Sequence, residues 1–363
     1  MPTTKLYDTF FTRLRQLRPM ERVTRLRNLA WMMSGIFLSK SVQLAKIASK
    51  IPGEAVQLSL VQRLHRFLDN PSFHVHTWYE PVARELLLQA AHSVGEIRLM
   101  IDATKCGFHH QWLTVSLAFQ HRAIPIAWTW RQGSKGHSSA TVQLALLGRV
   151  QALLPEKTPV LLVGDTEFED GDLQKQCCTW KWNYVLRQKP SNLVWADGKW
   201  QPFRALVDRP GTSRWIEGAL LTNKHHFQTN LLAYWAKGEE TPWLLSTNLP
   251  TPLQALKAYR RRMWIEEMHG DLKGHGFYLE DSHLHSFTRL SRLTLVVVLL
   301  YVWLIFEGAK IIRQGNRRIV DRNDRRDLSF FQIGFRSMER HLLNSQAFSF
   351  LSFLPSVSKL SGG

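Results

Sequence analysis

Apolar and polar positions in the centre of the chain follow two patterns. Short runs of β-forming residues predict strands, and helical spacing of apolar residues predicts a helix at 141–154. The predicted strands lie at 97–101, 113–120, 123–130 and 159–163. Asp102 directly follows the first of these runs, and Asp165 follows the last one after Gly164. Because α/β sheets commonly hold their reactive groups at strand ends, this region predicts an α/β core with both carboxylates at one edge.

The first 93 residues have a different pattern, with apolar positions at helical spacing and no strand-like runs. Two short helices, at 41–51 and 56–68, are predicted on either side of Pro52-Gly53. One interpretation is a helix-turn-helix unit, and the other is a plain helical bundle with a solvated basic face. Both make residues 1–93 a helical domain.

Short Trp-rich runs separated by Gly and Pro turns predict a small all-β segment at 191–249, inserted into the core. Helical spacing resumes at 252–273 and again, in a mostly apolar stretch, at 286–314. The predicted domains are a helical domain at 1–93, the first part of the core at 94–190, the β-rich insertion at 191–249, the second part of the core at 250–315 and a basic C-terminal region at 316–363.

The charge balance narrows the choice of partner. Lys and Arg number 47 against 29 Asp and Glu, a net charge of +18, which suits a polyanion such as nucleic acid. The longest apolar run, 293–306, falls short of the ~20 residues of a spanning helix. With no secretion-like N-terminus and no CxxC pair among three cysteines, we expect a cytoplasmic protein that does not use a membrane.

Basic residues are dense at the N-terminus, where residues 1–50 hold ten Lys and Arg against two Asp and Glu. We expect this region to bind DNA phosphates. The candidate contacts are Arg13, Arg15, Arg18, Arg22, Arg25 and Arg27.

A group of chemically active side chains shares one face of the predicted 252–273 helix. With Tyr259 at 0°, Arg262 falls at about 300°, Glu266 at about 340°, His269 at about 280° and Lys273 at about 320°, whereas Glu267 falls at about 80°. A carboxylate beside cations and a phenol suits a metal-bound phosphodiester. The alternative is a solvated charged face with i,i+4 pairs, such as Arg262 with Glu266.

Three carboxylates from separate segments add weight to the first interpretation. Phosphodiester cleavage by two hard cations needs several carboxylate oxygens, which Asp102, Asp165 and Glu266 would supply. Each Asp could instead be a loop-forming residue. The nearby acidic residues that compete with Asp165 are Glu167, Glu169, Asp170 and Asp172.

The spacing Tyr259-x2-Arg262-x3-Glu266-x6-Lys273 resembles the YREK signature of the insertion-sequence-4 family of cut-and-paste DDE transposases. The segments around Asp102 and Asp165 resemble the family's two Asp motifs, except that Thr166 stands where the family often has Arg. The resemblance implies an RNase H-like core, catalytic and metal-binding roles for Asp102, Asp165 and Glu266, and two Mg²⁺ per site, with Mn²⁺ able to substitute. It also implies phosphate contacts by Tyr259, Arg262 and Lys273.

The same resemblance implies a Trp that stacks on a flipped base, for which Trp243 is the best match and Trp235 the second; the alternative is that Trp243 is a core residue. It implies terminal inverted repeats and target DNA as partners, a homodimer in the synaptic complex, cleavage through a hairpin, and a bacterial, nucleoid-associated location.

Two other functions remain open at this point: a non-catalytic DNA-binding regulator derived from a transposase, and an RNase H-like nuclease without strand transfer. The paired histidines do not indicate a zinc site, because none has a Cys at zinc spacing. We expect them on the surface or facing DNA. They are His109-His110, His225-His226 and His283 with His285.

Overall fold

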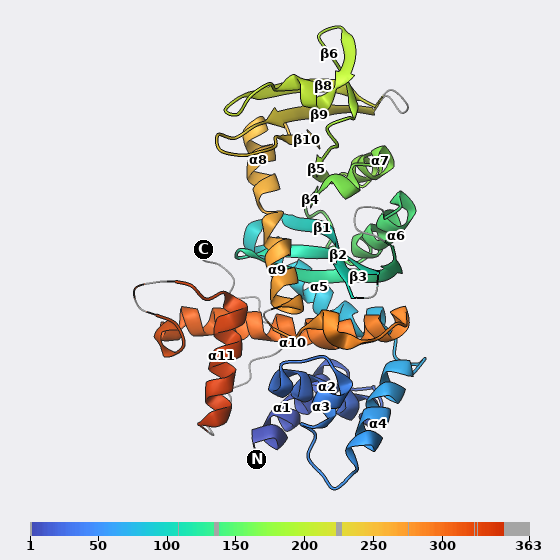
Figure 1. Ribbon diagram of the computed structural model, residues 1–363, viewed down its shortest axis with the longest axis vertical. Helices are drawn as coiled ribbons and strands as arrows, with labels where there is room; N and C mark the ends of the chain where they lie inside the picture. The colour runs from blue at the N-terminus through green and yellow to red at the C-terminus, as the bar shows by residue number, and fades with distance from the viewer. Residues whose placement is uncertain are drawn as a thin grey trace. The chain divides into compact units, whose positions relative to one another are not determined.

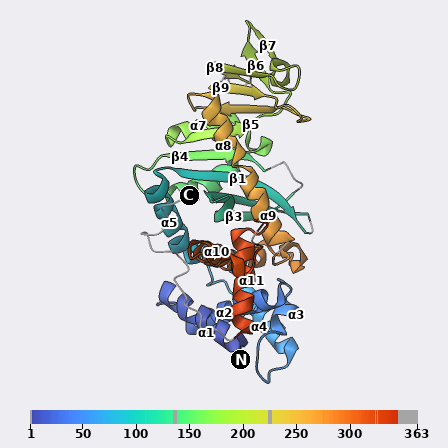
Figure 2. The same cartoon turned by 90° about the vertical axis from the view of Figure 1, so that its left-hand side faces the viewer.

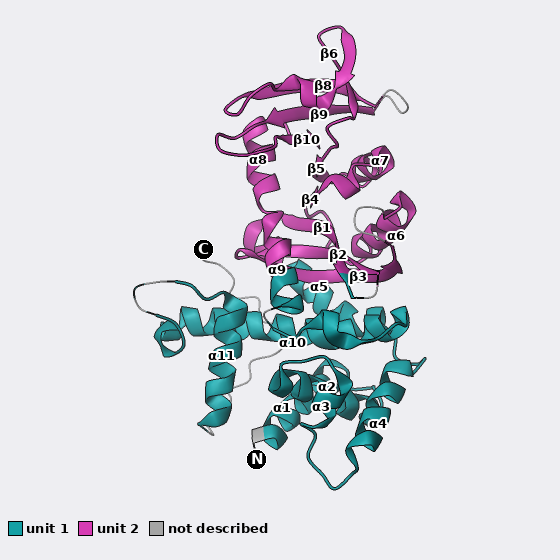
Figure 3. Cartoon of the chain, in the orientation of Figure 1, with its two compact units in different colours: residues 1–89, 106–108, 269–363 teal, residues 90–105, 109–268 magenta. Residues whose placement is uncertain are grey.

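The computed structural model describes residues 2–107, 109–133, 138–222, 227–274, 276–322, 324 and 326–344. The His225-His226 pair, Arg325 and the tail from 345 onward lie outside these residues. The chain divides into two compact units (Figure 3). Unit 1 comprises residues 1–89, 106–108 and 269–363, and unit 2 comprises residues 90–105 and 109–268.

Unit 1 is helical, as the spacing of apolar residues in the N-terminal region predicts. Its helices include α1 (Pro2–Leu17), α2 (Val23–Ser39), α3 (Leu44–Ala48), α4 (Gln57–Asp69), most of α5 (Val75–Val94), α10 (Phe287–Arg313) and α11 (Phe330–Leu343), with 3₁₀ turns η3 (Leu279–Ser282) and η4 (Asn316–Ile319). N-terminal and C-terminal segments therefore share one unit (Figure 1).

Helix α10 is the core of unit 1. The rings of Phe10 and Phe37 lie 5.0 and 6.2 Å from the ring of Trp303, and α11 crosses α10 at Gly308 and Gly334, where a Cβ would come within 2.0 Å of a backbone oxygen. The helix is long and apolar enough to cross a membrane, yet 89% of its most apolar stretch is buried inside the protein. A core helix explains both properties.

Unit 2 is built on one ten-stranded mixed sheet with the order β3-β2-β1-β4-β5-β10-β9-β8-β6-β7. The strands are β1 (Ile97–Cys106), β2 (His110–Phe119), β3 (Arg122–Gln132), β4 (Val160–Gly164), β5 (Asn183–Arg187), β6 (Leu193–Ala196), β7 (Lys199–Pro202), β8 (Ser213–Leu221), β9 (Phe227–Tyr234) and β10 (Trp243–Thr247). Strands β1, β4 and β5 are parallel, and the other described pairs are antiparallel. The predicted mixed α/β class is confirmed.

The helices of unit 2 include one, α6, between β3 and β4 as predicted, and one, α7, that the sequence did not predict. They are α6 (Ala140–Gln151), α7 (Gly171–Thr179), α8 (Pro252–Arg260) and the first part of α9 (Met263–Lys273), with 3₁₀ turns η1 (Thr166–Phe168) and η2 (Phe203–Leu206). Residues Ala255, Ala258 and Tyr259 of α8 pack on Leu161 and Val163 of β4, so this helix covers the parallel strands.

The Trp-rich segment forms strands where the sequence predicts them, but these strands extend the central sheet. Strand β10 pairs with β5 on one side and β9 on the other, so β6 to β9 continue the same sheet (Figure 2). A separate apolar cluster, which includes Val194, Phe203 and Leu231, lies under this outer part. The domain boundaries drawn from the sequence stay predictions.

Candidate active site

Strand register brings Asp102 and Asp165 together. Ile101 of β1 pairs with Gly164 of β4, and the two aspartates are the next residues of these parallel segments. Neighbouring strands lie about 4.8 Å apart, so the two carboxylates leave the sheet side by side. Asp102 does not end its strand as expected, because β1 continues to Cys106 beyond its pairing with β4.

The carboxyl of Asp102 has an unusual environment for an acid. It is 7% exposed, and burial raises its pKa to about 7, with further upward contributions from Asp165 and Glu266 and an opposing one from Arg262. Three carboxylates and one guanidinium thus act on one another electrostatically. Glu266 is thus one of the charged residues that act on Asp102, and the predicted grouping of Glu266 with the two aspartates stays a prediction.

In the loop after β4, Asp165 and its acidic neighbours have different hydrogen-bond partners. An oxygen of Asp165 accepts a hydrogen bond of 2.9 Å from the backbone N–H of Glu167. The carboxylate of Glu167 binds Gln111 and the backbone of Ser138 instead. Asp165 is the acidic residue of this loop whose charge acts on Asp102.

The helix that carries Glu266 differs from the prediction. Residues 252–273 form two helices, α8 and α9, because Arg261 and Arg262 bond three residues back, to Ala258 and Tyr259. Nη2 of Arg262 lies 2.6 Å from Oε1 of Glu266. The sequence offered this i,i+4 pair of Arg262 and Glu266 as the alternative to a metal-binding face, and the pair does form.

Two aromatic side chains lie beside this pair. Tyr259 is 3% exposed, and its ring lies 5.0 Å from Trp243 and 5.9 Å from the guanidinium of Arg262. Burial raises the pKa of Tyr259, while Arg262 and Arg187 lower it. Trp243 is half-buried and packs against the apolar cluster under α8, so it is partly a core residue.

Sequence reasoning missed Arg187, which lies at the end of β5. Its charge acts on the hydroxyl of Tyr259, and its Nη2 donates to the carbonyl of Pro242 at 3.2 Å. The signal was available in principle, because β5 is parallel to β4 and ends at the same edge of the sheet as Asp165.

Glu267 points away from the triad, as its helical phase predicts. It pairs with Arg122 at 3.2 Å, and the ring of His121 lies 4.8 Å from Trp264 on the same helix. The end of the β2–β3 hairpin thus holds the first turns of α9.

Lys273 and His269 belong to unit 1, where Lys273 pairs with Glu280 at 2.6 Å and His269 is buried. The expected phosphate contact by Lys273 stays a prediction. Trp235, the second stacking candidate, lies beneath the guanidinium of Arg204 at 4.2 Å.

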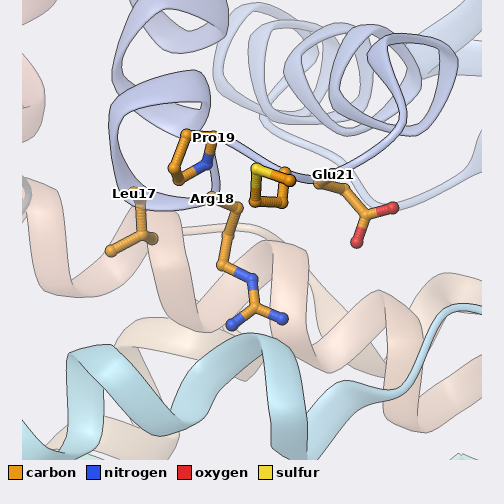
Figure 4. Close-up of a pocket in the computed structure, with 5 residues that line it drawn as sticks. Leu17, Arg18, Pro19 and Glu21 are labelled. Atoms are coloured by element: carbon orange, nitrogen blue, oxygen red, sulfur yellow. The ribbon is translucent and has the colours of Figure 1, made fainter.

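The six N-terminal arginines divide into two groups. Arg13, Arg18 and Arg25 are half-buried, and Arg18 lies 5.5 Å from the ring of Trp78. It also lines an open pocket with Leu17, Pro19, Met20 and Glu21 (Figure 4). The exposed members, which are those suited to reach a phosphate, are Arg15, Arg22 and Arg27.

Comparison with known families decides the class of protein. The family model for the transposase DDE domain matches residues 95–303, more than half of the 363 residues. This chain belongs to the DDE transposase family. No curated protein matches the sequence of the transposase. Among solved structures, it is similar to a piggyBac transposase in a synaptic complex with hairpin DNA, with a TM-score of 0.46 and 11% identity, over 99% of this chain and 83% of that chain.

The carboxylates of the transposase fit a hard divalent cation by their chemistry. All three supply oxygen ligands, which Mg²⁺ and Mn²⁺ prefer, and their mutual repulsion is what a cation would offset. Within the described residues, no three His, Cys, Asp or Glu side chains already converge as a metal cluster. Glu266 is instead drawn to Arg262.

Proposed function

We propose that this DDE transposase is a member of the insertion-sequence-4 family that cuts and pastes an insertion sequence. The observation that carries the proposal is the register of β1 and β4, which sets Asp102 beside Asp165, together with the 2.6 Å pair of Arg262 with Glu266 next to the ring of Tyr259; the charges of this pair also act on the carboxyl of Asp102. All five residues come from motifs that resemble those of the family, and the sheet order β3-β2-β1-β4-β5 supports an RNase H-like core. Residues 191–249 would be the inserted β-rich subdomain.

Asp102, Asp165 and Glu266 would hold two Mg²⁺ or Mn²⁺ ions per site. When bound, such cations lower the pKa of an attacking water and stabilise charge on the phosphate. The chain's own residues then do the positioning: Arg262, Arg187 and Tyr259 would bind the phosphate oxygens beside the cut.

One site can serve successive steps because each is an in-line displacement at phosphorus. Water would cut one strand at the transposon end, and the freed 3′-hydroxyl would attack the opposite strand to form a hairpin. After the hairpin is reopened, the same hydroxyl would join target DNA. Trp243, which lies 5.0 Å from Tyr259, would stack on a base flipped out at the bend, a contact of roughly 1–3 kcal/mol.

The terminal inverted repeats would be bound through unit 1, whose exposed arginines include Arg15, Arg22 and Arg27, and Lys273 would add a phosphate contact. The active assembly would be a homodimer that holds two ends, working in the bacterial cytoplasm on nucleoid DNA and away from membranes.

The decisive experiment uses DNA that flanks the gene, searched first for imperfect inverted repeats within a short direct duplication. A labelled duplex of such an end should be nicked by the purified protein with Mg²⁺ or Mn²⁺, and joined to a target plasmid. Ca²⁺ should allow binding with little cutting, because its looser coordination suits in-line attack poorly. Robust cleavage in excess EDTA, or no cleavage with any divalent cation, would reject the proposal.

A further inference from the structure

Glu167 is an acidic residue of unit 2 that the proposed chemistry does not use. It lies in η1, two residues after Asp165. Its carboxylate oxygens accept hydrogen bonds from Nε2 of Gln111 at 3.1 and 3.2 Å, and Oε1 also accepts from the backbone N–H of Ser138 at 2.9 Å. The side chain therefore joins the β4 loop to β2 and to the segment that precedes α6.

The donors around Glu167 are themselves fixed. Gln111 is fully buried in β2. Nε2 of Gln143, which is 1% exposed in α6, donates to the carbonyl of Ser138 at 3.0 Å, to its Oγ at 2.9 Å and to the carbonyl of Glu167 at 3.1 Å. Hydrogen bonds to an ionised carboxylate are stronger than neutral ones, so this network holds η1 in one place.

The network reaches the active site through one backbone group. The N–H of Glu167 donates to Oδ1 of Asp165 at 2.9 Å, which ties one carboxylate oxygen to the loop that Glu167 anchors. We propose that Glu167 is a positioning residue, which sets the orientation of the Asp165 carboxylate without touching the reacting atoms. This inference rests on the proposed function, in which Asp165 is a metal ligand.

A neighbouring carboxylate provides a matched control. Glu169 is also half-buried and also accepts several hydrogen bonds, from the backbone N–H of Lys189 and from Nδ2 of Asn192, both at 2.8 Å. These donors lie after β5, and they fix Glu169 to a different loop. Removal of either carboxylate breaks a comparable set of hydrogen bonds, but it is the backbone N–H of Glu167 that binds Asp165.

The test compares Glu167→Ala and Glu169→Ala with the full-length protein. Groups that orient a metal ligand typically change metal affinity 10- to 100-fold when removed. We expect Glu167→Ala to raise the half-saturating Mn²⁺ concentration for end cleavage by roughly that factor, with end binding in Ca²⁺ within about twofold of the unchanged protein. Glu167→Gln keeps an oxygen for the N–H of Ser138 and should recover part of the affinity. Glu169→Ala should leave the metal requirement unchanged.

Mn²⁺ binding to the DNA-free protein, followed by electron paramagnetic resonance, separates this inference from the proposed function. Weaker Mn²⁺ binding in Glu167→Ala alone supports positioning even if no end is cleaved. Equal metal affinity in both alanine variants, or an equal decrease in both that follows their thermal stability, overturns it. Absence of cleavage by the unchanged protein with every divalent cation counts against the proposed function instead. If Glu167→Ala does not fold, the comparison is made with Glu167→Gln and Glu169→Gln.

Discussion

Two adjacent carboxylates at the start of α9 have different surroundings. Glu266 lies 2.6 Å from Arg262 and acts on the carboxyl of Asp102, whereas Glu267 lies 3.2 Å from Arg122 on β3. Successive helix residues point about 100° apart, so only one of them can face the aspartates.

This difference predicts opposite results for two conservative substitutions. Glu266→Gln removes a ligand charge and should abolish metal-dependent nicking, while end binding is unchanged or slightly stronger because the protein then has one anion fewer near the phosphate. Glu267→Gln can still accept from Arg122 and should keep substantial activity. Nicking of a labelled end duplex, with binding measured in parallel, checks both. Normal nicking by Glu266→Gln with a dead Glu267→Gln would reject the triad.

The raised pKa of Asp102 predicts that the stability of the metal-free protein depends on pH. Its pKa is about 7 in the folded state and about 3.9 in an unfolded chain, so the folded state binds the proton more tightly. The free energy of unfolding should therefore fall as the pH rises between these values. Asp102→Asn should remove this contribution, so its stability relative to the unchanged protein should increase by on the order of 2 kcal/mol between pH 5 and pH 8. Denaturant unfolding in EDTA measures it, and a pH-independent difference would contradict it.

At the scale of elements, the β2–β3 hairpin contacts the part of α9 that lies in unit 2. His121 and Arg122 contact Trp264 and Glu267, and Oγ of Ser116 lies 3.6 Å from the sulfur of Met268. The contacts of His121 and Arg122 with α9 are partly exposed, and such contacts contribute little to the stability of the protein. Their effect should fall on the placement of Glu266.

A double substitution at the hairpin tests this role. His121→Ala with Arg122→Ala should lower single-turnover cleavage roughly 10- to 100-fold, because small misplacements of a reactive group are costly, with little change in thermal midpoint. Lys175→Ala, which breaks an exposed pair with Asp172 on α7, is the control and should leave cleavage unchanged. Equal cleavage by the two proteins would show that the hairpin does not position α9.

Sequence patterns predicted most of these elements, and the failures have physical causes. Strands β1 to β4 and α6 appear as apolar runs with clear turns between them, but the five residues of β5 follow a Trp-rich stretch without such a boundary. The break between α8 and α9 has no Gly or Pro to mark it. Motif spacing predicts Asp102, Asp165 and Glu266 as the triad, which stays a prediction, whereas the contacts of Arg187 and Glu167 depend on residues distant in the sequence that no local pattern encodes.

At the scale of the molecule, the proposed binding of DNA by unit 1 can be tested at its exposed N-terminal arginines. Deleting residues 1–50 would be a poor test, because Phe10, Leu14 and Phe37 are core residues. Substituting the exposed arginines leaves these core residues in place. Changing Arg15, Arg22 and Arg27 to Gln should weaken end binding and reduce the slope of log K against log salt by about 0.9 for each phosphate that the protein no longer neutralises. An unchanged slope would place the DNA-binding surface elsewhere.

The ion pair between Arg262 and Glu266 has a consequence for how the two ligands of the enzyme affect each other. Under the proposed function, a phosphate bound to Arg262 would leave an oxygen of Glu266 available to a cation, and a cation held by Glu266 would leave the guanidinium available to a phosphate. Thermodynamic reciprocity then requires Ca²⁺ to tighten end binding by the same factor by which end DNA tightens Ca²⁺ binding. Arg262→Gln should abolish this mutual enhancement in titrations of each ligand at saturating and zero levels of the other. Under the proposed function, an enzyme coupled in this way would hold Glu266 in an ion pair with Arg262 until a transposon end binds, and would therefore cut little DNA other than its own ends.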